Sequence, residues 1–230
     1  MASLIESVGR YLGEVEMRKF LLGGVALATV ATGAQATVNV SSTAYALAAP
    51  AGASVVIDFD DPSFAGFSLS GAGYLIQSGN NSQGAAPAAG PTDASDDATK
   101  YLSIYGGWAK LMGTVGYHGA SLYWGSIDGY NAVDLLDAGG NVFDTITAAT
   151  IASGSNGDQL AGNTNRRVDI ASTQAIYGLQ FRSTSAALET DNVAFSGPVP
   201  EPASWAMMLG GFGALGAVMR SRKKVSLAFA

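Results

Sequence analysis

The sequence predicts a mainly β chain, in which an antiparallel β-sandwich or jelly-roll domain is flanked by an N-terminal signal helix and a C-terminal transmembrane helix. Three observations support this fold class. Only 13% of the residues are charged and 30 of 230 are Gly, a composition that suits short strands joined by turns. Between residues 54 and 197, runs of alternating apolar and polar residues are separated by turn residues. Outside the two ends, no long stretch has the periodicity of an amphipathic helix.

The N-terminal segment has the layout of a secretory signal. The basic pair Arg18-Lys19 precedes an apolar stretch over residues 20–33, and Ala34-Gln35-Ala36 fits the A-x-A site of signal peptidase. We therefore expect passage through the export translocon and cleavage with Ala34 and Ala36 in the peptidase pockets. The segment ahead of the basic pair is acidic, which signals rarely are, and it is predicted to be an over-extended start.

The middle of the chain carries strand signals in order. From residue 55, a face of Val55, Ile57 and Phe59 alternates with the other face, which carries Asp58 and Asp60 after Val56, and Asp61-Pro62 ends this strand. Residues 137–141 contain two Gly and one Asn between apolar runs and predict a hairpin turn. Further strand signals lie at residues 101–105, 121–126, 134–136, 142–146, 177–182 and 193–195. Many short, evenly spaced strands favour an antiparallel sandwich or jelly roll.

One long segment of the middle region has almost no large apolar side chain. Residues 78–99 consist largely of Asn, Gly, Ser, Ala and Pro. This composition predicts a long surface loop, which is either disordered or folded over a site. The composition favours the first alternative.

The charge and the cysteine content exclude several function classes. From Thr37 to Gly197, five basic residues face fourteen acidic ones, a formal charge of −9. Such a surface repels phosphate backbones, so we expect no nucleic-acid partner. The chain has no Cys, which excludes thiol catalysis, thiolate metal sites and redox switching.

The sequence offers few catalytic residues. His118 is the only histidine and lies in a turn-like run between Gly116 and Gly119, while no G-x-S-x-G motif occurs. We expect a turn residue there rather than a catalytic base. A small domain also lacks the deep cleft that glycoside hydrolysis needs. Carboxylate pairs for that chemistry would come from Asp58, Asp60, Glu189 and Asp191. We therefore predict that the protein is not an enzyme.

Calcium binding suits these carboxylates better than glycoside hydrolysis does. Glu189 and Asp191 share strand parity with Val193 and Phe195, so both are expected to face the core. An inward carboxylate needs backbone donors, a cationic partner or a metal. Calcium often lies where the first and last strands of a jelly roll meet, which makes Asp58, Asp60 and Asp191 the candidate ligands. Alternatively, Asp191-Asn192 caps a bend through local hydrogen bonds.

Five aromatic residues are candidates for a surface on which a sugar ring stacks. Aromatic rings suit the apolar C–H face of a pyranose, but sandwich cores also bury Trp and Tyr routinely. The sequence favours the core. The five residues are Tyr105, Trp108, Tyr123, Trp124 and Tyr130.

The C-terminal segment combines a short motif, an apolar stretch and basic residues. Residues 203–219 carry no charge and are long enough, at about 25 Å as a helix, to reach the lower limit for crossing a membrane. A basic stop that should stay cytoplasmic follows, made of Arg220, Arg222, Lys223 and Lys224. The motif ahead of the helix comprises Pro200, Glu201, Pro202 and Trp205.

This tail resembles the PEP-CTERM sorting signal, in the subtype with Trp-Ala after the Pro-Glu-Pro motif. The same kind of tail is also catalogued as an ice-binding protein C-terminal domain, a name that implies nothing about ice. The resemblance implies recognition by a membrane-embedded exosortase, which cleaves near the motif and releases or re-anchors the protein. It also implies an inner-membrane-anchored precursor that ends at the cell surface or in the extracellular matrix.

Two further sequence segments, which we call phrases, resemble segments of known proteins. The run from Ser121 to Asn131 resembles a Tyr-Trp-Gly-Ser–Asp–Tyr-Asn segment of PEP-CTERM surface proteins of unknown function. The run from Ala187 to Phe195 resembles their closing strand, and a similar final strand occurs in lectin-like and carbohydrate-binding jelly rolls. These short resemblances bear on the fold more than on activity.

The expected organisation and function follow. We predict an exported envelope or biofilm-matrix protein with one non-enzymatic β-sandwich domain. One alternative is a carbohydrate-binding module that recognises polysaccharide, with or without calcium. Another is a small secreted hydrolase. The segments are an over-extended start (1–16), a signal peptide (17–36), a lead-in linker (37–53), the β-sandwich domain (54–197) and the sorting and anchor segment (198–224).

Overall fold

The computed structural model describes residues 36–92, 99–151, 153–199 and 202–221. The chain divides into two units, residues 1–35 and 36–230, and the described residues belong to the second. The predicted start segment and the predicted signal peptide through Ala34 lie outside the described residues, and Ala36 is the first described one.

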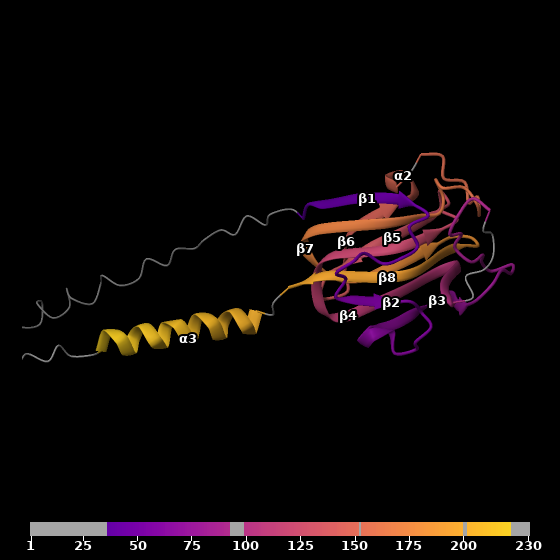
Figure 1. Cartoon of the computed structure of the whole chain (residues 1–230). Coiled ribbons are helices and arrows are strands. Elements are labelled where there is room, and N and C mark those ends of the chain that lie inside the picture. Colours follow the sequence, from indigo (N-terminus) through magenta and orange to yellow (C-terminus); the bar gives the residue numbers. More distant parts are fainter. Residues whose placement is uncertain (1–35, 93–98, 152, 200–201, 222–230) are drawn as a thin grey trace, which may run out of the picture. The chain divides into compact units, whose positions relative to one another are not determined.

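The described part is mainly β (Figure 1). All of its strand pairs are antiparallel. The strands are β1 (Val38–Ala44), β2 (Val55–Ile57), β3 (Ser68–Gln77), β4 (Tyr101–Gly125), β5 (Asn131–Leu136), β6 (Val142–Thr147), β7 (Arg166–Ser183) and β8 (Leu188–Pro198). The helices are the 3-10 turn η1 (Phe64–Gly66), α2 (Ala148–Ile151) and α3 (Pro202–Ser221).

The strands form one hydrogen-bonded network that folds over on itself as a sandwich. In one half, the first part of β4 lies between β3 and the second part of β7, and β5 and β6 continue this layer. In the other half, the second part of β4 lies between β8 and the first part of β7, with β2 and β1 at the edges. Strands β4 and β7 therefore pass together from one layer to the other.

The crossing of these two strands depends on glycine. The β4–β7 register shifts between Met112 and Tyr117, where the strands change layers. A Cβ at Gly113 would lie 2.7 Å from the Phe67 ring, and one at Gly116 would lie 2.7 Å from the Tyr177 ring. Aromatic rings occupy the space that side chains at these positions would need.

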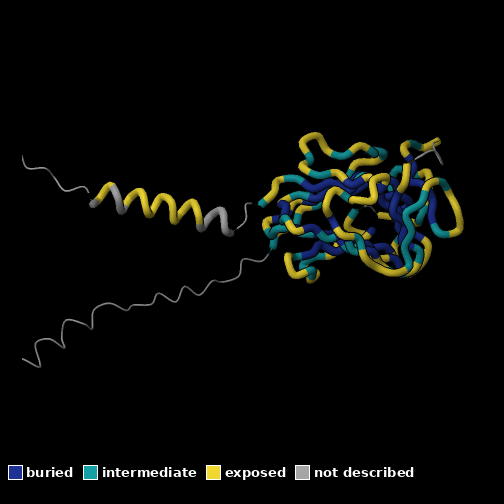
Figure 2. Tube along the Cα trace, turned by 90° about the horizontal axis from the view of Figure 1, so that it is seen from below, coloured by how far each residue is buried: buried dark blue, intermediate teal, exposed yellow. Residues whose placement is uncertain are grey.

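Both layers share one hydrophobic core. Its buried members include Leu111 and Phe181 from the first layer and Val168 and Phe195 from the second. The rings of Phe67 and Phe195 stack with centroids 4.7 Å apart. Figure 2 shows the buried residues along the strands and the exposed residues along the connecting loops. The expectation of a mainly β, sandwich-like antiparallel fold is thus correct.

The beginning of the domain differs from the sequence analysis. Residues 37–53 were assigned to a linker, but β1 forms at Val38–Ala44 and pairs along its length with β7. Beyond β1, the buried guanidinium of Arg167 donates to the carbonyl oxygens of Ala46, at 3.1 Å, and Leu47. Strand pairing and this arginine explain why the segment packs on the domain although it has few large apolar residues.

The strand signals in the middle of the chain are largely confirmed, with differences in strand length. The strand predicted from Val55 to Asp60 ends at Ile57. The hairpin predicted at residues 137–141 joins β5 to β6, and the Asp137 carboxylate accepts hydrogen bonds from the backbone N–H groups of Gly139 and Asn141. The two strands expected near residues 101–105 and 121–126 are instead the ends of the single 25-residue strand β4.

The domain has two distinct ends. Strand β1 begins beside Ser172, and β8 ends at Pro198 opposite Tyr117, so the chain enters and leaves at the end where β4 and β7 change layers. The loops after β1, β3 and β4 and those before β7 and β8 meet at the opposite end. We call these the tail end and the loop end.

The C-terminal segment forms a helix where the sequence predicts one. Helix α3 covers 20 residues, and its described side chains, including Phe212, Leu215 and Arg220, are exposed. Among the described residues, no helix combines the length and the apolar character needed to span a bilayer. The transmembrane helix expected over residues 203–219 is therefore not confirmed and stays a prediction. Arg222, Lys223 and Lys224 lie outside the described residues.

Candidate functional site

A polar pocket lies at the loop end of the sandwich, and we call it the distal pocket. It has a volume of about 170 Å³ and takes its walls from four loops. Its lining includes two carboxyl groups and, among the described residues, no basic side chain. The polar lining side chains are Asn81, Ser82, Ser126, Asp128, Gln159 and Glu189.

Glu189, near the start of β8, holds two of these loops. It is 2% exposed, and its Oε1 accepts a hydrogen bond from the backbone N–H of Ala85 at 3.0 Å. Its Oε2 accepts a hydrogen bond from the Ser126 hydroxyl. Burial raises the pKa of Glu189 to about 7, an effect that these two hydrogen bonds oppose and the nearby Asp128 charge reinforces. The inward position predicted for Glu189 is confirmed, and its partners are backbone and hydroxyl donors.

Tyr130 lies beside the distal pocket and contacts two of its lining residues, Asp128 and Ala186. The Tyr130 hydroxyl donates to Oδ2 of Asp128 at 2.6 Å and lies 2.9 Å from the carbonyl oxygen of Ala186. Burial and the hydrogen bond to Asp128 raise the pKa of Tyr130 to about 12, so its hydroxyl stays protonated at neutral pH. The Tyr130 side chain is nevertheless 39% exposed, and these contacts fix a solvent-facing aromatic ring.

The loop after β3 forms another wall of the pocket. The sequence predicts either a disordered loop or one that folds over a site. The described part, residues 78–92, folds over the pocket. Ala85, Ala86 and Ala88 are buried, and the Ala88 carbonyl oxygen accepts a hydrogen bond from the buried Tyr123 hydroxyl. Residues 93–98 lie outside the described residues.

The two phrases noted in the sequence meet at this site. Ser126 of the first phrase donates to Glu189 of the second, and the Asn131 side chain donates to the Ala187 carbonyl oxygen at 3.1 Å. Sequence reasoning identified Glu189 as an inward carboxylate but missed Asp128 as its neighbour. Side-chain periodicity gives no signal for such a pairing, since Asp128 lies in a loop far away in sequence.

The three calcium candidates Asp58, Asp60 and Asp191 do not belong to the distal pocket. Asp191 is buried as expected, but its carboxylate accepts from the backbone N–H of Asn192 at 2.6 Å and from the Asn192 side chain at 3.1 Å, which is the local bend-capping alternative. Asp58 accepts from the N–H of Asp60, and Asp60 from the N–H of Lys100. No group of three or more potential ligands is found in the described part of the chain. Calcium binding stays a prediction, which melting temperatures with calcium and with EGTA will test.

The five aromatic candidates separate into core and surface residues. Tyr123 and Trp124 are fully buried and Tyr105 is half-buried, whereas Trp108 is 40% exposed. Trp108 lies on the solvent side of the first layer, because its neighbour Ala109 belongs to the core. The aromatic residues thus form no single exposed cluster among the described residues.

Polar residues surround Trp108 on what we call the outer face, made of Trp108, Lys110, Asp134, Gln180 and Arg182. Arg182, the strand partner of Trp108, binds the Asp134 carboxylate through two nitrogens at 2.5 and 2.7 Å. Gln180 donates to the same carboxylate at 3.0 Å, and Lys110 donates to the Gly140 carbonyl oxygen at 3.1 Å. The polar groups of this face largely satisfy one another.

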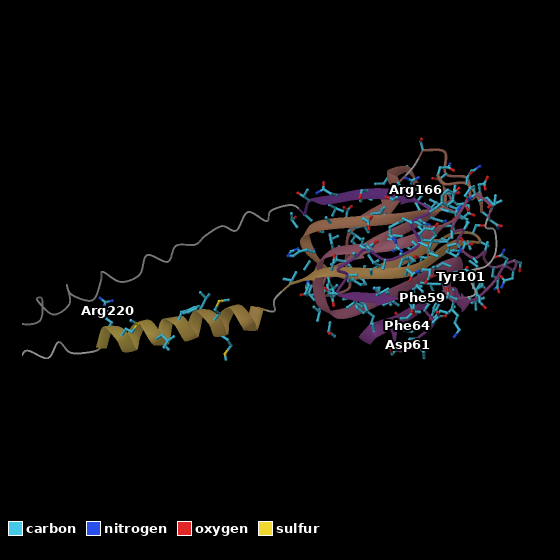
Figure 3. All side chains as sticks on the ribbon, viewed as in Figure 1. Phe59, Asp61, Phe64, Tyr101, Arg166 and Arg220 are labelled. Carbon is cyan, nitrogen blue, oxygen red and sulfur yellow. The ribbon has the colours of Figure 1, made fainter. Side chains whose placement is uncertain are left out.

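His118 lies at the tail end, remote from the distal pocket. It belongs to strand β4, so the turn expected between Gly116 and Gly119 is wrong. It is exposed, and its Nδ1 lies 3.0 Å from the Ser172 carbonyl oxygen. Tyr101, by contrast, contacts the loop after β3 through a 2.7 Å hydrogen bond to the Gly79 carbonyl oxygen, and Figure 3 shows it toward the loop end. The histidine and the pocket carboxylates therefore belong to opposite ends of the domain.

The architecture defines a class of protein: an antiparallel β-sandwich with a polar loop-end pocket and a C-terminal sorting segment. The family model described as the PEP-CTERM protein-sorting motif matches residues 198–223, so the chain carries this signal. The motif implies export, a membrane-anchored precursor and exosortase processing. Pro200 and Glu201 lie outside the described residues, and Pro202 and Trp205 fall in the first turns of α3.

Other comparisons are distant. CsCBM6-3 from Clostridium stercorarium, solved in complex with cellobiose, shows 14% identity, covers 62% of this chain and 92% of its own, and has a TM-score of 0.32. The K2 cleaved adhesin domain of Lys-gingipain shows 14% identity, covers 68% and 97% of the two chains, and has a TM-score of 0.23. At these TM-scores neither likeness supports an inference about this chain. No curated protein matches it.

Proposed function

We propose that this chain is an exosortase-sorted protein of the cell envelope or extracellular matrix whose β-sandwich domain acts without catalysis. The observation that carries the proposal is the direct junction between domain and sorting motif. Strand β8 ends at Pro198, where the motif match begins. The next N–H, of Val199, donates to the Gly116 carbonyl oxygen at 2.7 Å. The sorting segment therefore delivers the sandwich itself.

The contacts of the titratable residues support a non-enzymatic role. The distal pocket does contain two carboxyl groups, which a hydrolase would need. However, both oxygens of Glu189 already accept hydrogen bonds that hold the pocket walls. His118 lies at the other end of the domain, where it cannot serve as a base for groups in the pocket.

The intact mass of the mature protein, recovered from the envelope and the medium of its native host, tests the sorting proposal. We expect a chain that begins at Thr37 and ends near residues 200–202. The matched control is a chain with Glu201→Ala, which should remain in the inner membrane at precursor length. An unaltered protein that keeps residues 203–224 would show that the tail is a permanent anchor and would contradict sorting.

A second candidate function is glycan binding by the same domain. Its specific support is the exposure of two aromatic side chains beside fixed polar groups, Trp108 on the outer face and Tyr130 at the distal pocket. Aromatic rings of this kind stack on the C–H face of sugars while neighbouring polar groups bind hydroxyls. This candidate is compatible with a surface or matrix location, where polysaccharide is the expected partner.

A further inference from the structure

We propose that the distal pocket binds the terminal residue of a neutral oligosaccharide, with Asp128, Gln159 and Ser82 as its hydrogen-bonding side chains. The inference rests on the glycan-binding function above and assigns it to one site and one class of ligand. We assign binding to the distal pocket rather than to the outer face, because the two sites differ in how far their polar groups are already hydrogen-bonded.

The polar groups of the outer face are already engaged. Arg182 and Gln180 donate to Asp134, and Lys110 donates to a carbonyl oxygen, so a ligand there would have to break protein hydrogen bonds. In the distal pocket, the side chains of Ser82 and Gln159 line the cavity and make no hydrogen bond within the described residues. Asp128 contributes a carboxylate that is bound by Tyr130 at Oδ2. These groups offer donors and acceptors to a polyhydroxylated ligand.

The size of the distal pocket limits its occupant. Its volume is about 170 Å³, whereas pockets for larger ligands span about 300–1,000 Å³. One sugar residue entering end-on suits this volume, and a polysaccharide lying across it does not. The loops that wall the pocket therefore favour a chain terminus over the middle of a glycan.

The charge of the lining determines which sugars fit. Asp128 and Glu189 line the pocket without a basic residue, so uronic acids and phosphorylated sugars are repelled. A carboxylate such as Asp128 accepts hydrogen bonds from neutral hydroxyl groups, and bonds to charged groups are the stronger kind. The pocket therefore selects neutral hexoses and N-acetylhexosamines.

The walls of the pocket are held in place before any ligand arrives. Glu189 ties the loop after β3, through Ala85, to the loop after β4, through Ser126. The Tyr130 hydroxyl bonds Asp128 and the Ala186 carbonyl oxygen and so holds two lining residues together. Preorganised contacts of this kind reduce the conformational entropy that is lost on binding.

Calorimetric titration of the full-length chain tests the proposal. The chain is kept in a polyoxyethylene detergent, because glycoside detergents would compete. The probes are cellotriose, maltotriose and tri-N-acetylglucosamine, with trigalacturonate as the acidic comparison. Asp128→Asn should weaken binding of the best neutral probe about tenfold, as expected for a lost hydrogen bond to a charged group. Ser82→Trp, which fills the cavity from an exposed lining position, should abolish binding.

The matched control is His118→Ala, which alters an exposed side chain at the tail end and should leave the affinity unchanged. Trp108→Ala tests the outer face as the competing site. Melting temperatures of all variants show that the fold is kept. Weakening by the two pocket variants alone supports the proposal. Loss of binding only in Trp108→Ala would keep the glycan-binding function and overturn the assignment to the pocket. A preference for trigalacturonate would also overturn it. An absence of binding to every probe would refute both.

Discussion

Replacing Glu189 with Gln isolates the electrostatic cost of the distal pocket. Burial raises the pKa of this carboxyl from 4.5 to about 7. The folded state therefore binds its proton more tightly than the unfolded state does, and the free energy of unfolding falls as the pH rises between these two values. One pKa unit corresponds to about 1.4 kcal/mol, so this carboxyl lowers the stability at pH 8 by about 3 kcal/mol relative to pH 4.

Glu189→Gln keeps the shape of the side chain and remains neutral at every pH. Its carbonyl oxygen can still accept from the Ala85 N–H, and its amide can donate to the Ser126 hydroxyl oxygen. The variant and the unaltered protein should therefore unfold at similar urea concentrations near pH 4. At pH 8 the variant should be more stable by about 3 kcal/mol.

Urea unfolding followed by tryptophan fluorescence at half-unit pH steps measures this difference. Other titrating groups are common to both proteins and cancel in the comparison. Asp128→Asn serves as a second variant, because it removes a charge that disfavours ionised Glu189 and should move the decline in stability to lower pH. Two curves that stay parallel from pH 4 to pH 8 would refute the reasoning.

Three further substitutions test interactions inside the sandwich. The buried Thr190 hydroxyl has no hydrogen-bond partner in the described part of the chain, so Thr190→Val should raise the free energy of unfolding by about 1 kcal/mol; a lower melting temperature would contradict this. Arg182→Ala leaves the buried Asp134 carboxylate without its ion pair and should lower the free energy of unfolding by about 2–3 kcal/mol, measured in urea. Lys110→Ala, on the same face, should lower it by less than about 0.5 kcal/mol. Equal losses in the two variants would argue against the ion pair. Arg167→Met removes donors to three carbonyl oxygens and should speed hydrogen exchange in the segment that follows β1, while unchanged exchange there would exclude this role.

Much of the fold could be predicted from local patterns. The hairpin at residues 137–141 combines a turn sequence with flanking apolar runs, and these local signals do not depend on the rest of the chain. The sorting segment was also recognisable, because its motif, apolar stretch and basic residues follow one another in sequence. Both features are encoded by residues that are near neighbours along the chain.

Long-range features were harder to predict. Strand β1 has half-buried and exposed residues but no fully buried one, so its pairing with β7 leaves little hydrophobic pattern. A turn was expected between Gly116 and Gly119, whereas Gly113 and Gly116 accommodate aromatic rings within one continuous strand. The distal pocket assembles from loops that are distant in sequence, and the spacing of residues along the chain does not indicate that these loops come together.

Strand β8 connects the distal pocket to the sorting segment without interruption. Glu189 lies near its first residue and Pro198 is its last. At about 3.3 Å per residue, its 11 residues extend about 35 Å. Ladder hydrogen bonds run perpendicular to the strands, so tension between a bound glycan and the envelope would load the β4–β8 bonds in shear. Such bonds must yield together, whereas an edge pulled sideways opens one bond at a time. This geometry suits the transmission of tension along β8.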